Sequence, residues 1–175
     1  MDALIFIVDS VLTLAVYAFL LRLLLQLSRG DFRNPLSQAV LRLTNWLVLP
    51  LRKLLPPVGR VDTASLVAVF LVQLAAVGVV FLMTTGAMAP LPDLLWWSLR
   101  QAVVAVLQFY TIGVVVYALL SLVAPGTYSP AVGLLSSLCE PLLRPVRRIL
   151  PPVGGLDFSP LAVILGLQAL KILIL

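Results

Sequence analysis

Two copies of one sequence pattern make up this chain. Pro56–Gly59 reads Pro-Pro-Val-Gly, and the same four residues return at Pro151–Gly154, 95 positions later. Each copy lies between a basic cluster and a long apolar run, and at the same offset Asp62 aligns with Asp157. Leucine bias alone does not produce agreement spread over about 40 aligned positions. The sequence therefore predicts a tandem repeat of one structural unit.

The composition places much of the protein's surface in lipid. Hydrophobic residues make up 62% of the sequence, charged residues make up 11%, and the mean hydropathy is +1.14. A soluble domain needs far fewer apolar residues to form its core. We therefore predict an integral membrane protein of the all-α class.

Four apolar runs are candidates for transmembrane helices. A hydrocarbon layer of about 30 Å requires roughly 20 helical residues, and three of the runs reach that length. The fourth would span only about 24 Å at 1.5 Å per residue, which requires local thinning of the bilayer or little tilt. The predicted spans are residues 4–27, 64–83, 96–123 and 160–175.

The basic residues predict the orientation of these spans. Nine of the 12 Lys and Arg residues lie either between the first and second spans or between the third and fourth. By the positive-inside rule both of these segments are cytoplasmic and both termini lie outside. The two repeats, residues 1–84 and 96–175, then cross the membrane as parallel rather than inverted copies.

Each cytoplasmic segment is predicted to contain an amphipathic helix, over residues 36–55 and 131–150. Polar and apolar residues there recur at helical spacing on opposite sides, which is typical of a helix lying in the membrane interface. The basic residues either report topology alone or also contact anionic lipid head groups or a protein partner. The candidates for such contacts are Arg52, Lys53, Arg144, Arg147 and Arg148.

Two aspartates, Asp62 and Asp157, stand at equivalent positions just before the second span of each repeat. One hypothesis is that they stabilise a helix N-terminus close to the preceding cations. The other is that they form a cation site around a pseudo-twofold axis. In the second copy we expect Ser159 to cap the helix, with Pro160 in the first helical position.

Polar residues inside the spans are further candidates, because each is costly in hydrocarbon. Gln73 and Gln168 lie eleven residues past the two aspartates, at a depth of about 16 Å. They are expected either to hydrogen-bond across a helix contact or to line a polar pathway. Asp9 and Arg100 lie near the outer ends of their spans and are expected to form a salt bridge.

The residues that the sequence lacks disfavour several classes of function. It contains no histidine and one cysteine, Cys139, which excludes Ser-His-Asp and Cys-His catalytic sets and intramolecular disulfides. We expect no enzymatic activity, no metal site and no cofactor. The net charge of +5 reports membrane orientation, and we expect no binding of nucleic acid.

The run Glu140–Pro160, EPLLRPVRRILPPVGGLDFSP, resembles the signature of the YggT family of small bacterial integral membrane proteins. The first copy departs from it at Asn45–Trp46 and Ala64–Ser65, so the second copy is the better place to look for a binding site. The resemblance implies a multi-pass protein of the bacterial inner membrane without an established enzymatic activity. It also implies an association with osmotic tolerance and with the assembly or organisation of other membrane components.

Two hypotheses about function follow from these features. The first is a non-enzymatic scaffold or assembly factor whose cationic helices contact anionic lipid, a membrane-protein partner or a second copy of the chain. The alternative is a small ion channel or transporter with a polar pathway at the repeat interface. The parallel repeat and the two glutamines near the bilayer centre favour this alternative.

Overall fold

The computed structural model describes residues 2–28, 30–59, 61–123, 129–150 and 157–175. Six helices and an isolated bridge between Val58 and Val61 make up the regular structure of these residues, so the predicted all-α class is confirmed. The helices are α1 (Asp2–Leu27), α2 (Pro35–Leu54), α3 (Thr63–Thr85), α4 (Leu91–Val123), α5 (Pro130–Ile149) and α6 (Ser159–Ile174).

Three of these helices, α1, α3 and α4, are long and apolar enough to cross a membrane. The fourth expected span corresponds to α6, whose 16 residues would cover only about 24 Å. With 33 residues, α4 is longer than expected, because Pro92 and Asp93 in its first turn favour a helix start ahead of the apolar run. α3 ends at Thr85 and is followed by Gly86 as its C-cap, whose φ of 72° is a conformation that favours glycine.

Helices α2 and α5 begin in the same way, at positions 95 residues apart. Each starts with a proline, whose fixed φ suits the first helical position, and each follows a polar residue. The Asn34 side chain accepts the Leu36 N–H at 2.9 Å, and the Ser129 side chain accepts the Val132 N–H at 3.2 Å. These caps explain why both helices start within one residue of the expected position.

The described helices form two compact units. Unit 1 comprises Met1–Leu23 and Val40–Ala105, and unit 2 comprises Leu24–Ala39 and Val106–Leu175. The unit boundaries lie within α1, α2 and α4 and do not coincide with the ends of the sequence repeats. Each unit therefore contains parts of both repeats.

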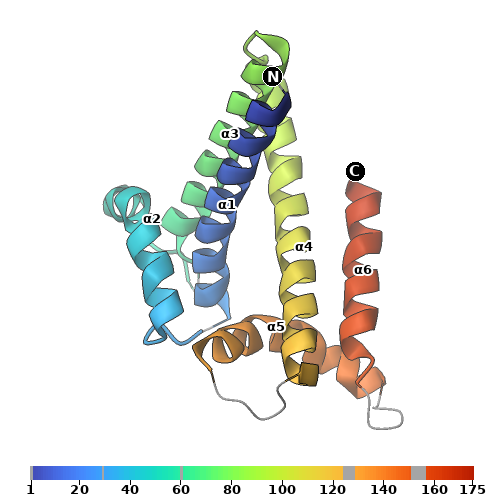
Figure 1. The fold of residues 1–175 in the computed structure, drawn as a ribbon. Coiled ribbons are helices and arrows are strands. Elements are labelled where there is room, and N and C mark those ends of the chain that lie inside the picture. The colour runs from blue at the N-terminus through green and yellow to red at the C-terminus, as the bar shows by residue number, and fades with distance from the viewer. Residues whose placement is uncertain (1, 29, 60, 124–128, 151–156) are drawn as a thin grey trace. The chain divides into compact units, whose positions relative to one another are not determined.

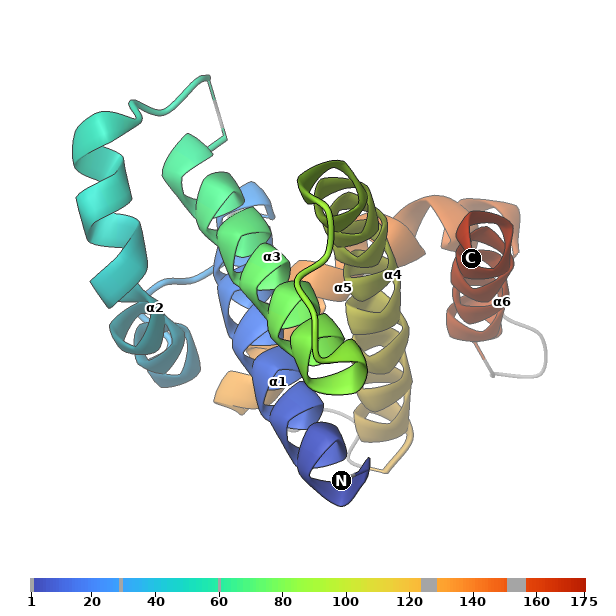
Figure 2. The ribbon, with the colours of Figure 1, turned by 90° about the horizontal axis from the view of Figure 1, so that it is seen from above.

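In unit 1, α1, α3 and the first part of α4 run alongside one another (Figures 1 and 2). α2 packs against α1, where the rings of Phe19 and Trp46 make an edge-to-face contact with centroids 6.1 Å apart. α2 also bends partway along its length in both views. This bend is expected from Pro50, which removes a backbone donor inside the helix.

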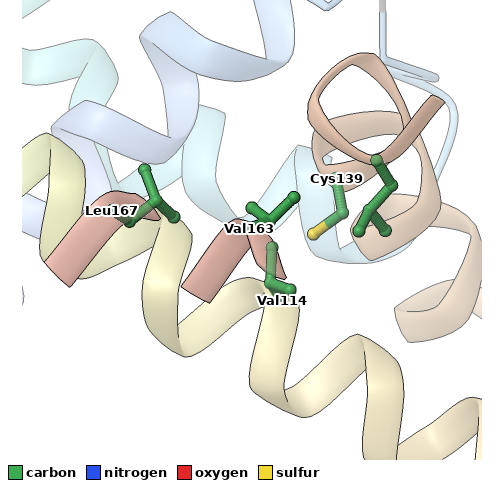
Figure 3. Close-up of a cluster of buried hydrophobic side chains, with 5 residues drawn as sticks. Val114, Cys139, Val163 and Leu167 are labelled. Atoms are coloured by element: carbon green, nitrogen blue, oxygen red, sulfur yellow. The ribbon is translucent and has the colours of Figure 1, made fainter. Parts of the chain in front are cut away.

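In unit 2, α5 runs across the ends of α4 and α6 (Figure 1). A cluster of buried side chains lies where the three helices meet, and Figure 3 shows it with the Cys139 sulfur beside Val114 and Val163. This unit 2 core fixes the position of α5 and of the basic residues that α5 carries. Its members are Val114, Cys139, Leu143, Val163 and Leu167.

Candidate functional site

Arg147 binds two carboxylates of the second-repeat signature, one on each side of it in the sequence. The guanidinium of this α5 residue donates to Glu140 Oε1 at 2.7 Å and to Asp157 Oδ2 at 2.8 Å. Tyr117, on α4, donates its hydroxyl to the same Glu140 oxygen at 3.2 Å. These four residues are named the second-copy cluster, and their hydrogen bonds connect α4, α5 and the segment that leads into α6.

Asp157 also marks the start of α6. Its Oδ1 accepts the backbone N–H of Ser159 at 2.9 Å, so the aspartate satisfies this N-terminal donor. The expected cap by Ser159 is wrong, because Ser159 is the first residue of the helix and its buried hydroxyl has no partner within the described residues. Burial opposes ionisation of Asp157, but hydrogen bonds from Ser159 N–H and from Arg147 prevail and lower its pKa.

The equivalent aspartate of the first repeat, Asp62, also binds an arginine of the preceding helix, but it makes no side-chain cap hydrogen bond to α3. Its Oδ2 accepts hydrogen bonds from Arg52 Nε at 3.1 Å and from Ser65 Oγ at 2.7 Å. Asp62 is almost completely buried, with an exposed fraction of 2%. Burial opposes its ionisation, but the hydrogen bonds from Arg52 and Ser65 prevail, and the pKa of Asp62 lies below its ordinary value.

Arg22 lies beside this aspartate network and was not among the predicted site residues. It is buried on α1 and donates from Nη1 to Thr44 Oγ1 and to Asn45 Oδ1 on α2, both at 2.8 Å. Its positive charge also helps to lower the pKa of Asp62. The first-copy cluster is defined as Arg22, Thr44, Asn45, Arg52, Asp62 and Ser65.

The two clusters occupy equivalent positions but distribute charge differently. The first copy carries two cations and one carboxylate, and the second carries one cation and two carboxylates. The offset of 95 could have revealed this correspondence, but an Arg aligned with a Tyr and an Asn aligned with a Glu give little sequence similarity. The equivalent pairs are Arg22 and Tyr117, Asn45 and Glu140, Arg52 and Arg147, and Asp62 and Asp157.

Each aspartate therefore forms an ion pair with an arginine of the preceding helix. A cation site shared by Asp62 and Asp157 would have to displace Arg52 and Arg147. Within the described part of the chain, no group of three or more Cys, Asp or Glu side chains is suited to hold a metal ion. Both carboxylates lie beside a cation, as the first hypothesis expects, but only Asp157 accepts a backbone N–H at a helix start, and Asp62 makes no such side-chain cap.

Ion pairing separates the five cations expected to contact lipid or a partner into two groups. Arg52 and Arg147 are bound to carboxylates. Lys53, Arg144 and Arg148 are exposed, and they form no ion pair with any residue that the structure describes. The charges of these three residues lie at the surface of α2 and α5.

Polar side chains join α4 to α6 within unit 2. Lys171 Nζ donates to Gln108 Oε1 at 2.8 Å, and Gln168 Nε2 donates to Thr111 Oγ1 at 3.5 Å. Gln168 thus has a partner in its own unit, whereas Gln73 is buried in α3 of unit 1. A contact between the two glutamines stays a prediction.

Asp9 and Arg100 do not form the expected salt bridge among the described residues. Asp9 is exposed on α1, and three residues before it Phe6 is 71% exposed. The carboxylate therefore lies on the outward face of α1, away from the helices packed in unit 1.

Relatives match nearly the whole length of the chain. The profile of the CCB3/YggT family matches residues 1–83 and 96–175, in agreement with two tandem repeats. A Pseudomonas aeruginosa relative, "Uncharacterized protein PA0392", is 40% identical over 99% of this chain and 88% of its own length. "Uncharacterized protein YggT" of Escherichia coli is 34% identical over 98% of this chain and 88% of its own length. No solved structure gives a significant match. The chain belongs to the CCB3/YggT family.

Proposed function

We propose that the protein is a non-enzymatic organiser of the bacterial inner membrane, a scaffold or assembly factor whose interfacial helices contact anionic lipid or a membrane partner. One observation carries this proposal: α5 divides its cations between an internal network and the surface. Arg147 is held by two carboxylates, whereas Arg144 and Arg148 lie exposed one turn apart. The network orients α5, and the exposed pair is available to an external anion.

The proposed arrangement has four spans, with α6 as the short fourth span, and places α2 and α5 in the cytoplasmic interface. The surface of α2 supports this placement. One side of the helix packs on α1, where Thr44 is buried, while Leu43 and Leu54 are exposed. A helix lying in the interface directs such apolar side chains into the acyl region and keeps its cations near the head groups.

Cysteine labelling in intact cells tests this orientation. Gln38 on α2 and Pro92 on α4 are both exposed. Pro92→Cys is expected to react with a membrane-impermeant maleimide in intact cells, and Gln38→Cys only after the cells are opened, because the cations hold α2 inside. Cys139 adds little background, because it is buried and burial raises the pKa of its thiol to about 11. Reaction of both introduced cysteines from the same side would contradict the four-span arrangement.

Binding of soluble phosphatidylglycerol to the detergent-solubilised protein tests the surface cations. Arg144→Gln and Arg148→Gln are each expected to weaken binding about fivefold at low salt, because one cation near an anionic surface contributes about 1 kcal/mol. The difference should shrink at high salt, since exposed charges are screened. Lys171→Gln removes the same charge from α6 and is expected to bind like the wild type. An equal loss in all three variants would mean that net charge alone governs binding, and the proposal would be wrong.

A small channel is the second candidate, favoured by the polar contacts between α4 and α6. Along α4, Gln108, Thr111, Val114 and Tyr117 follow one another at intervals of three. Val114 is completely buried in the unit 2 core. A water path from the polar contacts to the second-copy cluster would have to cross this apolar core, and this supports the scaffold over the channel.

A further inference from the structure

Arg22 is a buried cation that is incompletely satisfied. Its exposed fraction is 2%, and both of its hydrogen-bond acceptors, the Thr44 hydroxyl and the Asn45 amide oxygen, are neutral. Its Nε is buried and has no acceptor within the described residues. A guanidinium in such a place is strongly unfavourable unless an anion compensates it.

The first-copy cluster supplies only one anion for two guanidinium groups. Asp62 binds Arg52 directly and receives a further hydrogen bond from Ser65. Arg22 has no ion pair with it. The cluster therefore retains one uncompensated positive charge, in a position where water is largely excluded.

The second repeat contains the anion that the first repeat lacks. Glu140 occupies the position equivalent to Asn45, and its carboxylate accepts hydrogen bonds from Tyr117 and Arg147. The first repeat has an amide at this position and has an arginine, Arg22, where the second has Tyr117. The first repeat therefore lacks, at the position of Asn45, the negative charge that Glu140 provides in the second repeat.

We propose that the first-copy cluster binds a phosphate group, from an anionic lipid head group or from free phosphate. Phosphate oxygens accept several charge-assisted hydrogen bonds from arginine, and the unsatisfied Arg22 Nε and the Arg52 guanidinium would donate them. Arg52 is 44% exposed, so a ligand enters past its side chain. Binding of a lipid head group rests on the proposed function of the protein, whereas binding of free phosphate does not.

Asn45→Glu is the decisive variant, because it gives the first repeat the carboxylate of the second. The melting temperature of the full-length protein in a zwitterionic detergent is measured alone, with inorganic phosphate, with soluble phosphatidylglycerol and with the matching phosphatidylcholine. Wild-type protein is expected to gain about 4 °C with saturating inorganic phosphate or phosphatidylglycerol, and none with the zwitterionic phosphatidylcholine. Without a probe, Asn45→Glu should have a higher melting temperature than the wild type. Adding a probe should no longer raise the melting temperature of this variant. Gln38→Glu adds the same charge at an exposed position of the same helix and should keep the gain.

The probes distinguish the source of the phosphate group. A gain with inorganic phosphate identifies a free anion, and a gain with phosphatidylglycerol but not with phosphatidylcholine or phosphate identifies the lipid. Either gain supports the site if Asn45→Glu abolishes it and Gln38→Glu does not. No gain with any probe, or a gain that persists in Asn45→Glu, overturns it. A variant that combines Arg144→Gln and Arg148→Gln should keep the rise in melting temperature that Asn45→Glu abolishes. Loss of lipid binding at the α5 surface can therefore be distinguished from loss of binding at the first-copy cluster.

Discussion

Asp62→Asn is expected to lower the free energy of unfolding by about 3 kcal/mol. The substitution keeps the shape of the side chain but removes the one carboxylate of the first-copy cluster. The cluster then holds two guanidinium groups and no carboxylate, and Arg52 loses its ion pair. Removal of one partner from a buried pair costs about 3–5 kcal/mol, and the partial exposure of Arg52 places the expected value at the lower end. Unfolding of the full-length protein by SDS in mixed micelles measures the loss.

Asp157→Asn is the matched control in the second repeat. Its aspartate is exposed, and Arg147 keeps Glu140 as a partner. We therefore expect a loss of less than about 1 kcal/mol. Equal losses at Asp62 and Asp157 would contradict the unequal distribution of charge between the two clusters.

The stabilisation by Asp62 should also depend on pH. Because the pKa of Asp62 is lowered in the folded protein, its contribution is complete above the unfolded value of about 3.9. The contribution is lost as the pH falls through the folded pKa. Wild-type protein should therefore lose stability in this acidic range, and the loss should be smaller in Asp62→Asn.

Helices α2 and α5 were predictable because local signals mark both of their ends. A cap residue and a proline define each start, and the prolines that begin at Pro56 and Pro151 follow each end. The start of α4 was less predictable. Hydropathy indicates where the apolar run begins, but a helix can extend beyond that run. In α4, Pro92 and Asp93 favour a helix start that lies ahead of the apolar run.

The contacts of the two clusters differ in how far the sequence could reveal them. Arg52 and Asp62 are ten residues apart, so a short connection brings them together. Arg22 and Asn45 meet only because one side of α2 packs on α1, and the periodicity of α2 does not specify which side that is. The expected pairing of Asp9 with Arg100 fails for the same reason. Opposite charges at similar depth do not determine which helix faces meet.

Leu143→Ala is expected to destabilise the protein by about 3 kcal/mol, because truncating a buried leucine costs roughly 2–5 kcal/mol when the surrounding structure relaxes only partly. Leu143 has no exposed surface and belongs to the unit 2 core, which holds α5 against α4 and α6. Leu173→Ala removes the same atoms from a side chain of α6 that is 83% exposed and should change stability little. Unfolding in mixed micelles compares the two variants.

Leu143→Ala also separates the scaffold from the channel. If the core only fixes α5, proteoliposomes of the wild type and of Leu143→Ala should both show background ion flux, although the variant is less stable. A channel would behave differently. Val114 and Leu143 would then act as an apolar barrier between the polar contacts of α4 and α6 and the second-copy cluster, and a cavity at Leu143 would let water enter. Flux that rises in folded Leu143→Ala but not in Leu173→Ala would overturn the scaffold proposal, because a packing residue of a scaffold has no reason to control conduction.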